Sequence, residues 1–506
     1  MHETHKKSNN NNKKKIYDEL FIRRKKLKKI QKKGNAFPNN FRKDIISDKI
    51  HKMHGEKSKQ KLKKIKIIVN VAGRIMSKRT IGKSSFITLQ DMGGKIQLYI
   101  TSKDISENFY KKIFKTWDIG DIIGANGILF KTNTGELSVR CYKILLLTKA
   151  IRPLPDKFHG LNNREIKYRK RYLDLITNKN TRKIFKIRSR VILEIRNYMT
   201  KNNFIEVETP IMQNIPGGAT ANPFNTYHNA LKANMYLRIS PELYLKQLVI
   251  GGFEKIFEIN KNFRNEGLSP YHNPEFTMME LYIAYEDYRG LIVLIENLFQ
   301  ILTKKILGTN IIKYKNYVFN FNKPFCKMTM KEAICHFNKN IIPKELDNIV
   351  KINHIANSLK IKIEKEWGLG KIQTKIFENI TKNHLIQPTI ITHYPEEVSP
   401  LARKNDKNPF FTDRFELFIG GFEIGNGFSE LNDSEDQKIR FKKKQKKNNL
   451  HNKKNIPYDK NYITALEYGL PPTAGLGIGI DRLIMLFTNT KNIRDVILFP
   501  LLKPNK

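Results

Sequence analysis

The sequence has few cysteines, few tryptophans and no long hydrophobic run. Only 3 cysteines and 2 tryptophans occur in 506 residues. Because Cys141, Cys326 and Cys335 form neither a disulfide framework nor a paired metal-binding motif, we expect a reducing, cytoplasmic location. No stretch of about 18 uncharged apolar residues occurs, so we expect no transmembrane helix and no membrane partner. The polar residues 1–12 likewise indicate no signal peptide.

Acidic residues are also scarce. The chain has 93 Lys+Arg against 47 Asp+Glu, a formal charge of +46. Such a charge attracts polyanions, most often nucleic acid, but a composition rich in Lys, Asn and Ile would produce the same excess in an AT-biased genome. Residues 1–67 carry +17. Their apolar spacing predicts a basic helix at 16–34, either solvated or in contact with RNA, and the lysine-rich stretch 441–454 indicates an exposed insertion.

Hydrophobic residues make up 40% of the chain, which predicts folded domains. Residues 1–67 form the basic helical extension. Residues 68–150 contain five short β-runs, with a hairpin at Gly93-Gly94, and predict a small barrel of the OB type, which often binds single-stranded nucleic acid. The proline-rich start of 151–180 predicts a linker. Residues 181–506 open with an amphipathic helix and mix helices with antiparallel strand patterns, so the expected fold class is α+β.

A strand-and-loop pattern in the last segment places an arginine near a histidine. Arg264 ends one strand, and His272 lies in the following loop, which suits binding of a phosphate or carboxylate; taken alone, a surface salt bridge is the simpler explanation. The strand that returns, 276–285, places Phe276, Glu280 and Tyr282 on one face. A carboxylate beside a phenol suits an ammonium group, and the aromatic ring could stack on a flat ligand.

A predicted hairpin brings two glutamates together. A two-residue turn at Gly420-Gly421 would pair Glu416 with Gly425 and make Glu416 and Glu423 diagonal neighbours. Two such carboxylates repel unless a cation lies between them, and Mg²⁺ carried by a nucleotide is the natural candidate; two solvated glutamates are the alternative. Three residues further along fall on the opposite face: Asn426, Phe428 and Glu430. A bulge near Gly425 or Gly427 would be needed to unite them all.

In two further motifs, the positions of glycine or proline indicate the local structure. Glycines at every second residue of 475–479 would bare one strand face for a flat ligand, although a tight helix–sheet contact would need them too. Arg482 follows at the start of a helix. Earlier in the chain, Ser240 as the N-cap and Pro241 at the first helical position predict a helix start. The carboxylate of Glu242 at that N-terminus could meet an amine.

Together these motifs resemble the class II aminoacyl-tRNA synthetases, and most closely the bacterial-type lysyl-tRNA synthetases, from about residue 16 to residue 502. The family's motif 1 would be about 181–210, motif 2 about 257–285 and motif 3 about 473–490. The most specific signals are Arg-Asn-Glu-Gly with the following His-Asn-Pro-Glu-Phe-Thr-Met-Met-Glu, and Gly-Leu-Pro-Pro-Thr-Ala-Gly. One departure is Phe422, where the family usually has arginine. The resemblance implies an OB-type anticodon-binding barrel and a catalytic domain built on an antiparallel sheet flanked by helices.

The resemblance also implies roles for individual residues. Arg264 and Arg482 would be catalytic, the first gripping the α-phosphate and the lysine carboxylate, the second clamping the bent triphosphate. ATP would further contact Glu266, His272, Asn273, Phe276, Glu416 and Glu423. The last two, Glu416 and Glu423, would hold Mg²⁺. The amino acid lysine would be bound by Gly218, Glu242, Arg264, Glu280, Tyr282, Asn426, Phe428 and Glu430. The anticodon would be read by Phe86, Gln97 and Glu136.

The implied activity is formation of lysyl-adenylate from lysine and ATP, followed by transfer of lysine to tRNA(Lys). The resemblance further implies a homodimer with motif 1 at its interface. One alternative is a ligase that modifies a protein with lysine, but such relatives resemble only the catalytic half, and the barrel argues against this. Another is a non-catalytic RNA-binding relative, in which Arg264, Glu416, Glu423 and Arg482 would not all be expected.

Overall fold

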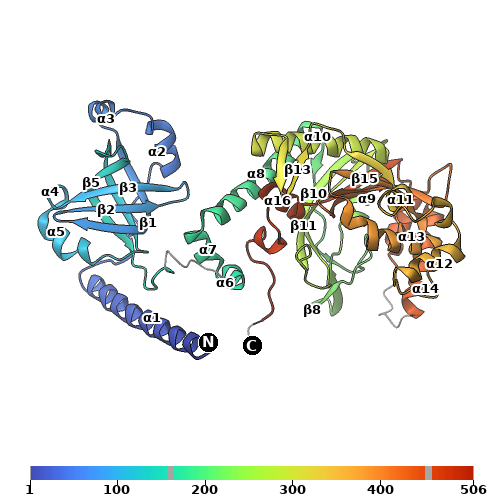
Figure 1. Cartoon of the computed structure of the whole chain (residues 1–506), viewed down its shortest axis with the longest axis horizontal. Helices are drawn as coiled ribbons and strands as arrows, with labels where there is room; N and C mark the ends of the chain where they lie inside the picture. Colours follow the sequence, from blue (N-terminus) through green and yellow to red (C-terminus); the bar gives the residue numbers. More distant parts are fainter. Residues whose placement is uncertain (1, 156–162, 451–457, 505–506) are drawn as a thin grey trace. The chain divides into compact units, whose positions relative to one another are not determined.

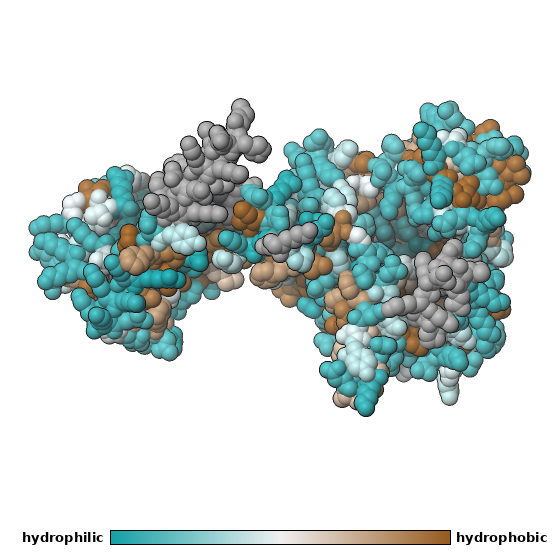
Figure 2. Space-filling view, turned by 90° about the horizontal axis from the view of Figure 1, so that it is seen from below, coloured by the Kyte–Doolittle hydropathy of each residue, from teal (hydrophilic) through white to brown (hydrophobic). Residues whose placement is uncertain are grey.

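Two large hydrophobic clusters organise the protein, one inside a β-barrel and one around a broad sheet (Figure 1). They belong to separate units, Met1–Gly160 and Leu161–Lys506. Our computed structural model describes residues 2–155, 163–450 and 458–504, with side chains described from residue 17 and, in the second range, up to residue 446. Figure 2 shows mostly hydrophilic side chains on its visible face, with hydrophobic ones scattered among them, as the charged composition predicts.

Five strands close into the predicted barrel in the order β1-β2-β3-β5-β4. Their bounds are β1 Ile68–Ile81, β2 Ser84–Gln90, β3 Lys95–Thr101, β4 Ile122–Lys131 and β5 Leu137–Thr148. Strand β1 is 14 residues long because it pairs with two neighbours, with β4 along residues 68–74 and with β2 along residues 74–81. The hairpin between β2 and β3 is confirmed, since Asp91 donates its backbone N–H to the Gly94 carbonyl.

Helices before the barrel and between its strands β3 and β4 complete the first unit. They are α1 His2–Gln31, α2 Ser47–His54, α3 Lys59–Ile65, α4 Ser102–Ile105 and α5 Glu107–Lys112. The helix predicted at 16–34 is therefore present but begins earlier. Ile50 of α2 and Leu62 of α3 are fully buried in the barrel cluster, so the end of the basic extension contributes to the barrel core.

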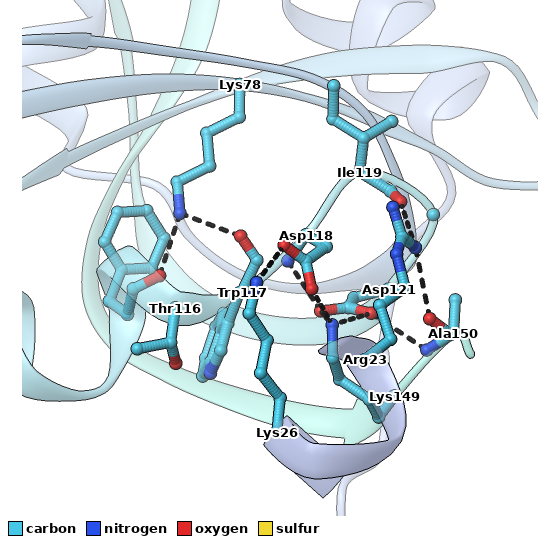
Figure 3. A network of polar contacts seen from close by, with 12 residues as sticks. Arg23, Lys26, Lys78, Thr116, Trp117, Asp118, Ile119, Asp121, Lys149 and Ala150 are labelled. Carbon is cyan, nitrogen blue, oxygen red and sulfur yellow. Dashed lines mark hydrogen bonds and ion pairs between the residues drawn. The ribbon is translucent and has the colours of Figure 1, made fainter. Parts of the chain in front are cut away.

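A network of buried polar contacts fixes α1 to the barrel (Figure 3). Arg23 on α1 is 5% exposed and donates to two backbone carbonyls at 3.0 and 3.1 Å. Lys26 on the same helix contacts Asp118 at 2.6 Å. The buried Lys149 contacts Asp118 and also Asp121, the latter at 2.8 Å. Charge pairing therefore holds this basic helix in place.

An eight-stranded sheet organises the second unit in the order β14-β15-β16-β17-β18-β11-β10-β6. Its strands are β6 Ile205–Glu206, β10 Lys255–Phe263, β11 Glu275–Ala284, β14 Cys326–Thr329, β15 Thr389–Pro395, β16 Phe411–Ile419, β17 Phe422–Ser429 and β18 Thr473–Gly479. The strands from β15 to β10 are antiparallel as predicted. The outer pairs, β14 with β15 and β6 with β10, are parallel, because each is joined by a long crossover containing helices. The sheet is therefore mixed.

Helices of the second unit, several of which flank this sheet, complete its fold (Figure 1). They are α6 Arg164–Arg169, α7 Arg171–Thr177, α8 Lys179–Lys201, α9 Glu242–Ile250, α10 Tyr288–Leu307, α11 Met330–Phe337, α12 Ile349–Ser358, α13 Leu369–Ile376, α14 Ser434–Leu450, α15 Lys460–Glu467 and α16 Ile480–Thr488. Smaller sheets contain β7 Met212–Gln213, β8 Phe224–His228 and β9 Ala233–Leu237, and β12 Ile311–Tyr314 with β13 Tyr317–Asn320. The stripe predicted on α8 is confirmed, since Val191 and Ile195 are fully buried. Within the described ranges, no helix combines the length and hydrophobicity needed to cross a bilayer.

Two segments differ from their predicted character. The linker expected at 151–180 contains α6 and α7, and the buried Arg171 donates to three backbone carbonyls between residues 494 and 498. The stretch 441–454 is not wholly exposed, because Phe441 packs on a buried cluster and Lys444 lines a cavity. Composition alone does not reveal which residues of such a basic stretch pack against the fold. Residues 451–454 lie outside the described ranges.

Candidate active site

A cavity of about 1070 Å³ in the second unit collects the motifs that the sequence spreads over more than half the chain. All the site residues predicted in this domain line it: Gly218, Glu242, Arg264, Glu266, His272, Asn273, Phe276, Glu280, Tyr282, Glu416, Glu423, Asn426, Phe428, Glu430 and Arg482. A surface salt bridge at Arg264 and a solvated edge hairpin at Glu416 and Glu423 do not account for this convergence. The predicted residues face one another across a shared space.

Strands β11 and β18 provide one wall of the cavity. The even-numbered residues of β11 line it as predicted, and glycines of β18 pair with them: Gly477 with Glu280 and Gly475 with Tyr282. A Cβ atom on Gly475 would lie 2.1 Å from Glu430 Oε1 and 2.5 Å from the Tyr282 ring. No side chain tolerates such distances, so glycine at 475 makes room for both of these polar groups.

A β-bulge in β17 gives its side chains a common direction. The predicted pairing of Glu416 with Gly425 is wrong, since Glu416 pairs with Asn426. The register shifts because Ile424 is one extra residue between the ends of the hairpin. This is the bulge that the sequence required near Gly425. It places Glu423 on the same side as Asn426 and the alternate residues beyond it.

Three buried carboxyl groups form what we call the acidic cup: Glu242, Glu280 and Glu430, which are 7%, 6% and 2% exposed. Ser240 donates its hydroxyl to Glu280 at 3.0 Å, and Tyr282 donates to the same carboxylate at 3.4 Å. Burial and the charge of Glu242 raise the pKa of Glu280 to about 8. Such a cup suits an amine, because an ammonium group favours the ionised form of each acid.

Sequence analysis missed a buried lysine in the cup wall. Lys246 on α9 has no exposed surface, donates to Glu242 Oε1 at 2.8 Å and contacts Glu430 Oε2. A lysine four residues after Glu242 in an otherwise apolar helix was the available signal. Glu430 Oε1 is buried and has no hydrogen-bond partner among the described residues. Because such atoms normally have partners, this oxygen marks where a ligand donor would bind.

Two arginines line the cavity outside the acidic cup. The Arg264 guanidinium lies 5.1 Å from the centre of the Phe276 ring, and its buried Nε has no partner in the part of the chain that the structure describes. Arg482 donates to Nε2 of His272 at 3.1 Å and contacts Glu423 at 3.4 Å. Burial and the Arg482 charge lower the pKa of His272. Guanidinium groups with open donor positions suit phosphate and carboxylate oxygens.

The carboxylates of Glu416 and Glu423 interact electrostatically. Burial raises the pKa of Glu416, and the charge of Glu423 raises it further, although Arg414 opposes this at 2.6 Å. Burial also acts on Glu423, but Arg482 and Lys382 more than offset it and lower its pKa. Among the described residues, no group of three or more His, Cys, Asp or Glu could hold a metal ion. Two carboxylates nevertheless fit Mg²⁺ that arrives with nucleotide oxygens and water.

Helix α9 begins one residue later than predicted. Pro241 occupies the N-cap position, and the helix starts at Glu242. Ser240 still caps it from one residue further out, because its hydroxyl accepts the Glu242 N–H at 3.2 Å. Gly218 lies against this turn with φ +80°, and a Cβ there would be 3.0 Å from Glu242 and Ser240 side-chain atoms. The cup entrance beside Glu242 is therefore tightly packed.

Phe422, the departure from the family's arginine, is 5% exposed. It stacks on Tyr271 with 5.1 Å between ring centres, and its edge meets Tyr314 at 5.8 Å. The side chain therefore packs in an aromatic cluster beside Glu423 and adds no charge there. Arg482 contacts Glu423 directly. That carboxylate therefore has a cationic partner although residue 422 is not an arginine.

The three residues predicted to read an anticodon lie on the barrel. Phe86 is half-buried outside the barrel core, with its ring 5.0 Å from that of Tyr99 on the paired strand. Gln97 donates to Ser138 at 3.0 Å, two residues from the exposed Glu136. Phe86 therefore does not serve ordinary core packing. The adjacent Tyr99 was missed because the predicted hairpin makes these two strands neighbours but does not fix which residues pair across it.

Comparison with known proteins covers both units. Residues 69–147 match the OB-fold nucleic acid binding domain, and residues 163–503 match the tRNA synthetases class II (D, K and N). The chain is 60% identical over 506 residues to the lysine–tRNA ligase of Sodalis glossinidius (strain morsitans), covering 100% of both chains. It is also 60% identical over 491 residues to that of Edwardsiella ictaluri (strain 93-146), covering 97% of each, and over 488 residues to that of Baumannia cicadellinicola, covering 96% of each.

These matches confirm the resemblance inferred from the motifs. They span the barrel and the sheet together, so the α+β fold with an N-terminal OB barrel is confirmed as well. A relative of the catalytic half alone would leave the barrel unmatched. With 60% identity over its whole length, the chain belongs to the class II lysyl-tRNA synthetases.

Proposed function

We propose that this enzyme joins lysine to tRNA(Lys) in two steps at the cavity described above. A lysine carboxylate oxygen attacks the α-phosphorus of ATP, forming the adenylate as the bond to pyrophosphate breaks. A ribose hydroxyl at the 3′ end of the tRNA then attacks the adenylate carbonyl, and AMP leaves. The observation that carries this proposal is the buried acidic cup in one cavity with two arginines, which matches an amino acid with two ammonium groups and one carboxylate.

The acidic cup would select lysine by its charge. Glu242, beside Gly218, would bind the α-ammonium group. The ε-ammonium group would lie among Glu280, Tyr282 and Glu430, where Glu430 Oε1 has an open acceptor position among the described residues. The remaining contacts to the amino acid would come from Asn426 and Phe428. A substrate without the ε-ammonium would leave buried acids unpaired, which penalises it heavily.

ATP would occupy the region lined by the arginines. Arg264 would contact the α-phosphate and the lysine carboxylate, which holds the two reacting groups together. Arg482 would contact the outer phosphates from the opposite side. The adenine would stack on Phe276, with further contacts from Glu266, His272 and Asn273. Little proton transfer is needed, so catalysis would consist of positioning and of neutralising the phosphate charge.

Glu416 and Glu423 would hold the Mg²⁺ that class II synthetases generally use with ATP. Bound there, the ion would neutralise phosphate charge and orient the triphosphate. Glu416 is fixed for this task by Arg414 at 2.6 Å and by the Tyr394 hydroxyl at 3.0 Å. Both contacts leave carboxylate lone pairs free for a cation, since an ionised carboxylate can accept about four hydrogen bonds.

The barrel would bind the lysine anticodon. Phe86 would stack on a base, while Gln97 and Glu136 would form hydrogen bonds with base edges. Tyr99 extends this aromatic surface towards Phe130, whose ring centre is 5.7 Å away. Successive rings on a barrel face are typical of single-stranded nucleic acid binding, because each base offers a flat surface for stacking.

A homodimer with motif 1 at its interface is supported by exposed apolar residues there. Ile205 on the edge strand β6 and the nearby Met212 are 50% and 53% exposed. An edge strand with apolar side chains is commonly covered by a partner. We also propose a cytoplasmic location, which agrees with three free cysteines, Cys141, Cys326 and Cys335.

Exchange of labelled pyrophosphate into ATP tests the first step without tRNA. The purified protein should catalyse exchange only with lysine and Mg²⁺ present, and no other standard amino acid should support it comparably. Transfer of labelled lysine to tRNA(Lys) tests the second step. Exchange that is independent of lysine, or no exchange at all, would contradict the proposed function.

A further inference from the structure

A lysine of the protein itself lies directly behind the site proposed for lysine. Lys246 has no exposed surface, and its ammonium group lies between Glu242, at 2.8 Å, and Glu430. The same group is 5.6 Å from the centre of the Phe428 ring. All three neighbours line the cavity, whereas Lys246 does not. It therefore supports the cup from behind and leaves the space in front of the acids open.

The ammonium group of Lys246 keeps its charge in this position. Burial alone would lower its pKa, but the charges of Glu242 and Glu430 raise it well above its ordinary value. Burial has the opposite consequence for the acids, raising the pKa of Glu280 and of Glu430. The empty cup can therefore carry protons on its acids, and a bound ammonium group would displace them.

Counting formal charges shows what Lys246 contributes. Glu242, Glu280 and Glu430 bear three negative charges when ionised, and Lys246 bears one positive charge. These four groups together therefore carry a net −2 once the protons have left, with Lys444, which lines the cavity and also acts on Glu242, outside this count. A lysine substrate carries two ammonium groups, so the two sets of charge cancel. Without Lys246 the cup would retain an unpaired buried negative charge, which is strongly disfavoured in a protein interior.

We infer that Lys246 is a positioning residue that holds Glu242 and Glu430 in their binding orientations and sets the charge of the cup to match a dicationic amino acid. This inference rests on the proposed function of the cup. Lys246 does not touch the substrate in this arrangement and acts through the two glutamates. The fixed ammonium group between the two glutamates also restricts rotation of their carboxylates. Their remaining oxygens therefore stay directed into the cavity.

Replacing Lys246 tests the inference in the full-length enzyme. In Lys246→Met, the KM for lysine in pyrophosphate exchange should rise by about 30-fold or more, while the KM for ATP changes by less than about threefold. The ratio of kcat/KM for lysine over norleucine, which has the same carbon chain without the ε-ammonium group, should fall. General loss of structure would instead lower kcat/KM for lysine and kcat/KM for norleucine by the same factor. Lys246→Arg keeps the charge and should recover part of the loss.

Lys149→Met is the matched control. Lys149 is also buried between two carboxylates, but it lies in the barrel unit. This change should lower thermal stability and leave the KM for lysine unaltered. If Lys246→Met does not fold, Lys246→Gln replaces it in the same comparison. An unaltered KM for lysine in the folded variant, or an equal fall for lysine and norleucine, would overturn the inference. Loss of lysine-dependent exchange in the unaltered protein would instead contradict the proposed function.

Discussion

Two buried lysines, Lys149 in the barrel and Lys246 beside the cavity, each contact two carboxylates, yet the two clusters differ in how completely they are satisfied. Both oxygens of Asp121 accept from Lys149, and each also accepts a backbone N–H. Glu430, in contrast, has two buried oxygens with no hydrogen-bond partner among the described residues, and Oε2 alone has an ion contact with Lys246. The barrel cluster is closed, whereas the cup has an open position.

The pKa directions separate the two clusters in the same way. In the barrel, burial is outweighed by Lys149 and Lys26, so the pKa of Asp118 is lowered. In the cup, burial and the Glu242 charge prevail, and the pKa of Glu280 rises to about 8. A buried charge pair whose polar atoms all have partners stabilises the fold. One that remains unbalanced is typical of a binding site.

Asp121→Ala gives the largest expected effect on the closed cluster. Removing one partner leaves Lys149 buried with less compensation, which costs about 3–5 kcal/mol. Thermal unfolding of the full chain should therefore shift to lower temperature, while lysine-dependent exchange at 25 °C remains normal. Asp406→Ala, at an exposed pair, should change the unfolding temperature little. An unaltered unfolding curve for Asp121→Ala would show that the barrel cluster does not stabilise the fold.

Glu430→Gln tests the open cluster. The change removes a charge proposed to face the ε-ammonium group and should weaken lysine use by about 2–4 kcal/mol. In exchange assays, the KM for lysine should rise far more than the KM for ATP. Glu435→Gln, on the exposed start of α14, is the control and should alter neither. Equal losses for both substrates would mean that Glu430 does not determine specificity.

Phe86→Ala tests the barrel surface, where aromatic rings lie outside the hydrophobic core. Loss of one stacked base costs about 1–3 kcal/mol, so kcat/KM for tRNA should fall about tenfold or more. Pyrophosphate exchange should stay nearly intact. Phe37→Ala, at a half-exposed phenylalanine of the same unit, provides the comparison. A parallel fall in exchange would contradict the assignment of the barrel to anticodon binding.

Proton release on lysine binding gives the smallest effect. With a pKa of about 8, Glu280 is mostly neutral at pH 7 in the empty cup. A bound ammonium group favours the carboxylate, so binding should release protons at pH 7 and fewer at pH 9. Lys246 stays charged over this range, while Glu430 titrates in the same direction as Glu280. Calorimetry in buffers of different ionisation enthalpy measures the release. Glu280→Gln should reduce it, and unchanged release would contradict this account.

Much of this architecture can be predicted from the sequence, because the spacing of apolar residues indicates which face of a helix or strand is buried. The alternation in 68–150 predicts the barrel, and the stripe on α8 predicts its buried face. Motif residues that the sequence singles out all line one cavity. Alternation indicates a bulge near Gly425 or Gly427 but does not identify Ile424 as the inserted residue, since the position of a bulge is a property of the pairing between two strands. Lys246 escapes notice for a related reason. A lysine in a helix is usually solvated, and only tertiary packing places this one between two acids.

The bulge at Ile424 links the two binding regions proposed for the small substrates. The strand that carries Glu423 into the region proposed for ATP also carries Asn426, Phe428 and Glu430 into the region proposed for lysine. Both sets point the same way only because one residue is added between them. Deleting Ile424 would leave the hairpin long enough to form. The side chains of Asn426, Phe428 and Glu430 would then turn away from the cavity, so lysine affinity should fall while ATP affinity is retained. This strand should therefore tolerate many side-chain replacements better than any change in its length.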